Sequence, residues 1–117
     1  MTLNEVMRVL DAQLVCGDRK LSVEISSVTA ADLMSDLLAF SRERTLLLTG
    51  LVNGQVIRTA ELIDIVAIVF VRGKRPSEEM IDLAVQKGIP LLVTKYTLYD
   101  TCGLLYVSGL RPGTTAS

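Results

Sequence analysis

The hydrophobic positions of this chain fall into short groups whose spacing changes from helical to extended and back. Residues 3–10 place apolar side chains at the spacing of one helix face, behind Asn4 as a good N-cap, and so predict a short helix. Residues 14–16 predict a brief strand, and residues 23–30 alternate as extended chain does. A further helix is expected over residues 33–40. The N-terminal part is therefore expected to mix short helices with short extended segments.

From residue 45 onward, strands and helices alternate regularly. The pattern predicts strand 45–49, helix 55–63, strand 65–71, helix 77–87, strand 89–94 and a last helix over 96–105. The run of residues 65–71 is β-branched and uninterrupted, which is typical of a central strand covered on both faces. Gly88 is a natural C-terminal glycine for the fourth of these elements. Each connection is long enough to hold a helix, so the sequence predicts an α/β fold with a mainly parallel sheet flanked by helices.

Length and composition agree with one domain. A chain of 117 residues supports a single core, which we expect to span residues 1–108, followed by a flexible tail over residues 109–117. Half of the residues are hydrophobic but only 4% are aromatic, so the core is expected to be aliphatic.

The charge balance narrows the choice of partner. With 12 basic and 13 acidic residues the net charge is −1, so the chain has no electrostatic reason to bind nucleic acid. Low net charge together with a mean hydropathy of +0.44 predicts exposed apolar patches, and hence a homodimer.

The sequence predicts neither a membrane-spanning segment nor an export signal. The longest apolar run, residues 65–71, is far shorter than the roughly 18 residues of a membrane span. Glu5 and Asp11 interrupt the apolar positions at the N-terminus, so we expect a cytoplasmic protein. Cys16 and Cys102 are far apart in sequence and are read as free thiols. A disulfide or a metal shared across a dimer is the alternative.

The chain lacks the side chains that most enzymes need. It has no histidine, the commonest general base and metal ligand, so we expect no enzyme activity, no catalytic residues, no metal and no cofactor. Asp32 and Asp36 lie one helical turn apart, but Asp32 is better read as a helix cap and Asp36 as a solvent-facing residue. Lys20 alone is a poor activator for Cys16.

A basic turn, residues 72–75, precedes the helix over residues 77–87. A phosphate loop of the P-loop type needs a second glycine and a lysine at the helix start, and this turn has only Gly73. Glu78 and Glu79 already occupy the first helical turn, where they would repel a phosphate. We expect either a solvated turn or a contact with a ligand or partner.

The ends of the parallel strands nevertheless mark the edge where a ligand would bind in an α/β sheet. Strands 45–49, 65–71 and 89–94 all end there, which predicts a cleft suited to a small anion or nucleotide. The candidate residues for binding a ligand or partner are Thr49, Gly50, Asn53, Arg72, Gly73, Lys74, Thr94, Lys95 and Tyr96. Each also has an ordinary structural explanation as a strand end, turn or packing residue.

The order of four motifs resembles the DRTGG domain family. "LLLTG", "VFVRG", "PSEEMIDLAVQKGIPLLVT" and "YTLYDT" follow the family's order, with Val71, Arg72 and Gly73 at the place of the T-G-G turn. The resemblance implies a fold like the N-terminal domain of HPr kinase/phosphorylase and a noncatalytic module that dimerises. Relatives occur beside nucleotide-sensing domains in regulated pyrophosphatases and in association with iron hydrogenase genes.

Two functions compete at this point. One is a stand-alone regulatory module, associated with hydrogenase or energy metabolism, that forms a homodimer and meets a partner protein at its strand-end loops. The other is a sensor that binds an adenine nucleotide or another anionic metabolite at the edge of the sheet.

Overall fold

The apolar runs of the chain form the strands of one sheet. The computed structural model describes residues 1–32 and 44–112. In that part of the chain the element order is α1 (Leu3–Val9), β1 (Gln13–Cys16), the 3₁₀ helix η1 (Asp18–Lys20), β2 (Ser27–Ala30), β3 (Thr45–Thr49), α3 (Gly54–Leu62), β4 (Ile65–Phe70), α4 (Glu78–Lys87), β5 (Leu91–Val93), α5 (Leu98–Val107) and β6 (Arg111–Pro112).

The sheet is mainly parallel, as the sequence predicted. Its strand order is β1-β5-β4-β3-β2-β6, in which β2 to β5 run parallel and β6 runs parallel to β2. Only β1 is antiparallel, against β5, and its register shifts between Leu14 and Cys16. The strand over residues 65–71 is confirmed as central, since β4 lies between β3 and β5.

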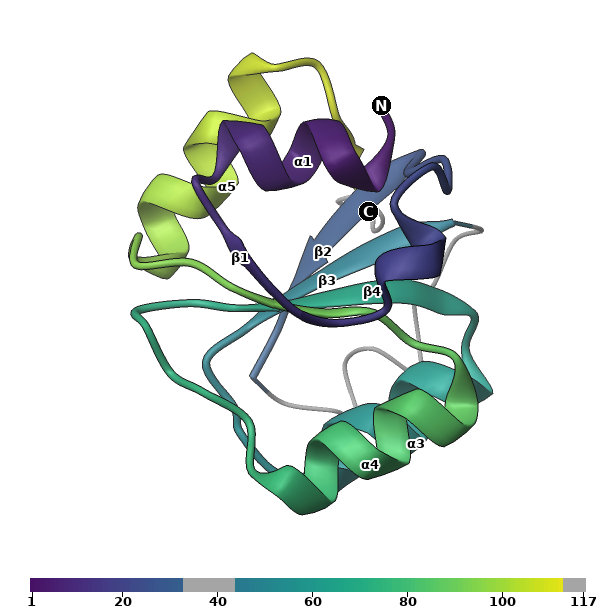
Figure 1. The fold of residues 1–117 in the computed structure, drawn as a ribbon. Coiled ribbons are helices and arrows are strands. Elements are labelled where there is room, and N and C mark those ends of the chain that lie inside the picture. Colours follow the sequence, from purple (N-terminus) through teal and green to yellow (C-terminus); the bar gives the residue numbers. More distant parts are fainter. Residues whose placement is uncertain (33–43, 113–117) are drawn as a thin grey trace.

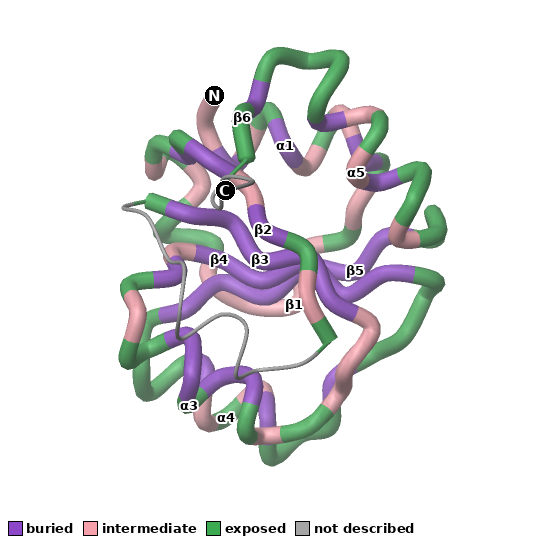
Figure 2. The backbone as a smooth tube through the Cα atoms, turned by 180° about the vertical axis from the view of Figure 1, so that it is seen from behind, coloured by how far each residue is buried: buried purple, intermediate pink, exposed green. Residues whose placement is uncertain are grey.

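Helices cover both faces of the sheet. Figure 1 shows α1 and α5 on one face and α3 and α4 on the other. Successive strand residues point to opposite faces. Leu46, Leu48 and Val69 therefore join the core under α1 and α5, whereas Ile68 and Phe70 join the core under α3 and α4. Figure 2 shows the strands buried between these two layers.

Capping side chains set the helix ends. The sequence prediction of Asn4 as the N-cap of the first helix is wrong: Thr2 caps α1 and forms a capping box with Glu5. The predicted limits of α4 are confirmed, with Ser77 as N-cap and Gly88 in the left-handed conformation as C-cap.

The last helix begins later than predicted. The Thr97 hydroxyl accepts a hydrogen bond from the Asp100 N–H over 3.1 Å, so α5 starts at Leu98 rather than at Tyr96. The chain then turns through Gly109, which has a φ of 104°.

Two predicted segments extend beyond the described residues. The helix expected over residues 33–40, together with Asp36, lies outside them. Of the segment expected to be a flexible tail, Leu110 is buried and Arg111–Pro112 pair with β2, whereas residues 113–117 lie outside the described part. Within the described ranges, no helix has the length and apolar character needed to cross a bilayer.

Candidate functional site

The ends of β3, β4 and β5 lie at one edge of the sheet. Lys74, after β4, donates from Nζ to the carbonyl oxygen of Gly50, after β3, over 3.2 Å. On the other side, the N–H of Gly73 donates to the carbonyl oxygen of Thr94, after β5, over 2.8 Å. Gly50, Gly73 and Lys95 therefore belong to one rim, which we call the strand-end rim.

Asp32 joins a fourth strand to this rim. It follows β2, and its Oδ1 accepts hydrogen bonds from the Thr49 hydroxyl and from the Gly50 N–H, each over 2.9 Å. The sequence reading treated Asp32 only as a helix cap. Its place here was missed because β2 had not been counted among the parallel strands whose ends meet. An aspartate just beyond an extended segment was the available signal.

The two candidate threonines are structural in this geometry. The Thr49 side chain is buried, and besides donating to the carboxylate described above, its hydroxyl accepts from the Leu51 N–H over 3.0 Å. The Thr94 hydroxyl is also buried; it donates to the Leu10 carbonyl oxygen over 2.7 Å and accepts from the Tyr96 N–H over 3.4 Å. Both hydroxyls are thus engaged inside the fold rather than offered to a ligand.

The basic turn is a tight left-handed corner. Arg72 and Gly73 have φ angles of 59° and 68°, and the Lys74 N–H donates to the Val71 carbonyl oxygen over 3.2 Å. The Arg72 N–H donates to the Tyr96 carbonyl oxygen over 2.8 Å. These backbone groups are therefore committed to internal hydrogen bonds and do not form an anion-binding nest.

Cationic side chains remain available at the rim. Arg72, Lys74, Arg75 and Lys95 are all exposed, and the structure shows no ion pair between them and a carboxylate of the described residues. Arg75 donates to the Gln13 side-chain oxygen over 2.9 Å, which ties it toward β1. Arg72 and Lys95 are the rim cations best placed to meet an anion.

The nine candidates do not share one hollow. Asn53 caps α3 through its bond from the Gln55 N–H and lines a polar cleft of about 410 Å³ between α3 and α4. Glu79 and Asp82 line that cleft together with one cation, Arg58, so carboxylates outnumber cations there and the cleft does not favour an anion. Tyr96 instead lines a shallow, mostly apolar hollow of about 630 Å³ along α5.

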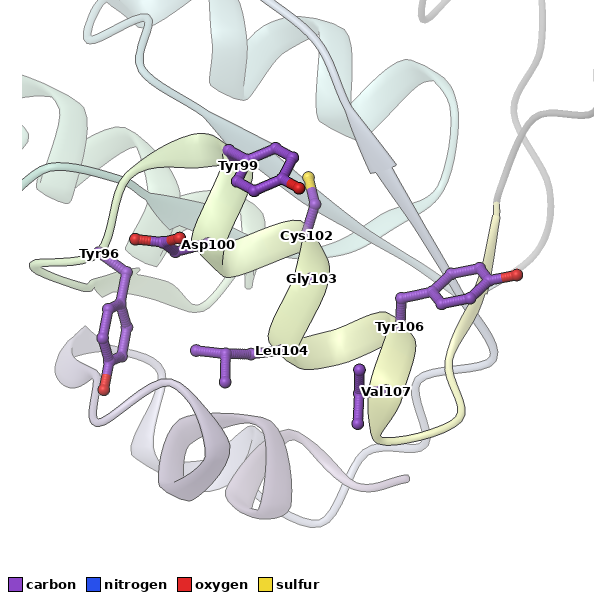
Figure 3. A pocket seen from close by; sticks show the side chains of 8 residues that line it. All are labelled: Tyr96, Tyr99, Asp100, Cys102, Gly103, Leu104, Tyr106 and Val107. Carbon is purple, nitrogen blue, oxygen red and sulfur yellow. The ribbon is translucent and has the colours of Figure 1, made fainter.

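An exposed aromatic surface runs along α5. All three tyrosines of the chain lie there, and with Val107 they form what we call the aromatic face: Tyr96, Tyr99, Tyr106 and Val107. Figure 3 shows that Tyr99 and Tyr106 project away from the helix, whereas Leu104 and Val107 point toward α1. The composition predicted apolar patches, but the sequence reading did not locate this one. The seven-residue spacing of Tyr99 and Tyr106 was the signal.

Both thiols are free and partly buried. Burial raises the pKa of Cys16 above its ordinary value, and backbone hydrogen bonding partly offsets this effect. The same two influences raise the pKa of the Cys102 thiol. A raised pKa keeps each thiol protonated near neutral pH, which is the opposite of what a nucleophilic cysteine requires. In the described ranges, no cluster of three or more histidine, cysteine or acidic residues could hold a metal.

One comparison with known proteins identifies a family for this chain. The sequence model of the DRTGG domain matches residues 5–107. A comparison with curated proteins found no significant match. Among solved structures, the chain is similar to the CBS and DRTGG domains of the regulatory region of Clostridium perfringens pyrophosphatase, complexed with the activator diadenosine tetraphosphate.

The structural likeness concerns the fold. The TM-score to the pyrophosphatase region is 0.75 at 18% sequence identity, over 99% of this chain and 51% of that one. This chain thus spans about half the length of the regulatory region it resembles.

Proposed function

Because the chain belongs to the DRTGG domain family, we propose that it is a noncatalytic regulatory module that acts by associating with a second copy of itself and with a partner protein. The exposed apolar surface of α5 supports this proposal best. Tyr99 is 86% exposed, although aromatic side chains are of the kind that proteins place in interfaces, and the apolar Val107 on the same helix is 87% exposed. The two free thiols suit the reducing cytoplasm, where we place the protein.

Light scattering over a roughly 100-fold dilution series tests self-association. We expect the mass of a dimer throughout the higher concentrations, with dissociation only toward the dilute end. A monomer mass at every concentration would contradict the homodimer. Capture of a partner protein by the wild-type chain should then be compared with capture by Arg72→Ala, which changes the strand-end rim where the partner is expected and leaves the tyrosines of α5 unchanged. We expect the variant to capture less of the partner.

A second candidate function is the sensing of an anionic metabolite at the strand-end rim. Three rim cations, Arg72, Lys74 and Lys95, support it, because they follow the adjacent strands β4 and β5 and have no ion-pair partner among the described carboxylates. The similar pyrophosphatase region was crystallised with diadenosine tetraphosphate, so phosphate-bearing nucleotides are the first ligands to try on this chain.

A thermal-shift experiment tests the sensor with diadenosine tetraphosphate, ATP and inorganic phosphate. A ligand at about 100 times its Kd adds about 2.7 kcal/mol to the free energy of unfolding, which raises the unfolding temperature measurably. We expect the rise to disappear in Arg72→Ala and to persist in Arg19→Ala. Arg19 is an equally exposed arginine on η1, near the opposite edge of the sheet. Unchanged unfolding temperatures with all three ligands would contradict the sensor.

A further inference from the structure

The composition of α5 is unusual for a helix that covers a sheet. One face, with Thr101 and Leu105, is buried against the sheet, as the covering role requires. The opposite face carries Tyr99 and Tyr106, and Asp100, which lines the same hollow, is the only residue of the helix that is charged at neutral pH. A helix that is apolar on most sides is normally buried on most sides, whereas no described residue covers the outward face of α5.

Gly103 leaves room for another backbone to approach this face. It lies in the middle of α5, where glycine is the poorest helix former after proline. Its φ is not in the left-handed region, and a Cβ built on it would meet no atom within 4 Å. Among the described residues, neither conformation nor packing therefore requires glycine here, and the missing side chain would permit the close approach of a second helix.

We propose that a second copy of this chain docks on the aromatic face, with α5 of the two copies antiparallel and the two-fold axis passing between Cys102 and Gly103. This inference rests on the proposed self-association and assigns it a surface. A two-fold axis at that point places Tyr99 of each copy opposite Tyr106 of the other, so that one pair of contacts satisfies both copies. Gly103 then lets the helices cross at the short end of the usual 8–10 Å separation.

The charge of the surface suits a copy of itself. A two-fold axis brings like groups together, so a charged face would repel its own copy. The two Asp100 side chains would lie on opposite sides of the axis, about 8 Å apart along the helices, since each residue advances the helix by about 1.5 Å. The proposed contact between the two α5 helices needs no ion pair, so we expect the dimerisation constant to be insensitive to salt.

The exposed area is also of the right size. Aromatic side chains bury about 150–250 Å² each, so the exposed parts of Tyr96, Tyr99, Tyr106 and Val107 amount to about 450–500 Å². A standard interface buries about 800 Å² on each partner, of which roughly 60% is apolar. The aromatic face thus supplies about the apolar area of one side of a stable dimer.

Analytical ultracentrifugation of the wild-type chain and of a Tyr99→Asp/Tyr106→Asp variant tests the surface. We expect the variant to dimerise at least about 100-fold more weakly, because two central aromatic anchors are replaced by charges. Leu62→Asp is the control: Leu62 is an apolar residue on α3 that is 74% exposed, so a negative charge is introduced on the other side of the sheet, and dimerisation of this variant should stay within about threefold of wild type.

A second pair of measurements places the axis. A short bismaleimide should link two wild-type chains, and the product should persist in Cys16→Ser and disappear in Cys102→Ser. Gly103→Leu should weaken dimerisation by at least about tenfold, because the added side chains hold the helices apart. The same change should raise the unfolding temperature of the dissociated Tyr99→Asp/Tyr106→Asp chain, which shows that α5 still folds.

The outcomes separate the surface from the proposed self-association. A wild-type dimer that survives Tyr99→Asp/Tyr106→Asp overturns the assignment of the surface and leaves the homodimer standing. If Leu62→Asp weakens dimerisation as much as Tyr99→Asp/Tyr106→Asp does, the assignment is also overturned, because the effect would then not depend on which surface carries the new charge. A wild-type chain that is monomeric at all concentrations overturns both, even if its aromatic face captures a different protein.

Discussion

At the scale of single residues, the corner after β4 holds a side chain where glycine would fit better. Arg72 has a φ of 59°, a left-handed conformation that disfavours residues with a Cβ. The following Gly73, with a φ of 68°, shows the residue that such a corner prefers. An arginine in this position suggests that its guanidinium has a use outside the fold.

We expect Arg72→Gly to stabilise the chain slightly. Relief of the left-handed strain contributes about 1–2 kcal/mol, and the greater freedom of glycine in the unfolded chain opposes it by about 0.4–1 kcal/mol. The net gain in the free energy of unfolding therefore lies between about 0 and 1.6 kcal/mol, and denaturant titration measures it. Arg72→Ala keeps the strain and should show no gain; equal stability of the two variants would refute the argument.

The two thiols allow a prediction about pH. Because burial raises the pKa of Cys16 and of Cys102, the folded chain favours the protonated thiols. Their contribution to stability is complete below the pKa of an unfolded cysteine and is lost as the pH rises through the folded pKa. The rate of alkylation by iodoacetamide should accordingly rise at a higher pH in the folded chain than in the unfolded chain. Single Cys16→Ser and Cys102→Ser variants assign the rates, and coincident pH profiles would contradict the prediction.

At the scale of elements, the strands and helices with one strong signal were predictable. β3 was predicted with its observed limits because five apolar or threonine residues lie between polar positions, and α4 because Ser77 and Gly88 mark both ends. The predicted N-cap of α1 was wrong. Thr2 and Asn4 are both good N-caps, and Thr2 takes the position because its side chain and that of Glu5 form a capping box. The start of α5 was displaced for the same reason, because Thr97 takes the cap.

The sequence predicted which edge of the sheet carries the candidate site, but not which side-chain groups are free there. Parallel strands require that Gly50, Gly73 and Lys95 meet, and they do. The hydrogen-bond partner of each hydroxyl could not be predicted from the sequence. Nothing near Thr94 in the sequence indicates that its hydroxyl donates to the carbonyl oxygen of Leu10, which lies 84 residues away in the chain. Which groups remain free for a ligand therefore depends on contacts that form only in the folded chain.

Thr94→Val tests the structural role of that hydroxyl. Removing the donor to the buried Leu10 carbonyl oxygen should lower the free energy of unfolding by about 1–3 kcal/mol, measured by denaturant titration. Exposed Lys95→Ala should change it by less than about 0.5 kcal/mol. If the rim binds an anion, only Lys95→Ala should reduce the ligand-induced rise in unfolding temperature. A neutral Thr94→Val would show that the contact between β5 and α1 is dispensable.

At the scale of the whole molecule, one sheet separates two apolar cores that share every central strand. Neighbouring residues such as Ile68 and Val69 belong to opposite cores, so neither core can be lost while the other keeps its strands. The uninterrupted apolar run of β4 made this arrangement predictable. The placement of the tyrosines was not, because α5 is apolar on both its inner and its outer face.

The shared sheet predicts a single unfolding transition. All three tyrosines lie on the α5 side, so tyrosine fluorescence reports on that layer, whereas circular dichroism reports on both layers. Ile68→Ala, made on the α4 side, should lower the free energy of unfolding by about 2–5 kcal/mol, and the two probes should still give coincident transitions. Two separate transitions would show that the layers unfold independently.

The borders of the sheet limit how the molecule can assemble. On one side the irregular register of β1 interrupts an even row of backbone donors and acceptors, and on the other side β6 is two residues long and ends in Pro112, which has no N–H to offer. Lateral addition of a foreign strand is disfavoured at both borders, so the chain is poorly suited to seed fibres or to capture extended peptides. Contacts between copies of the chain should therefore form through the helices. At high protein concentration we expect discrete oligomers rather than fibres built by strand addition.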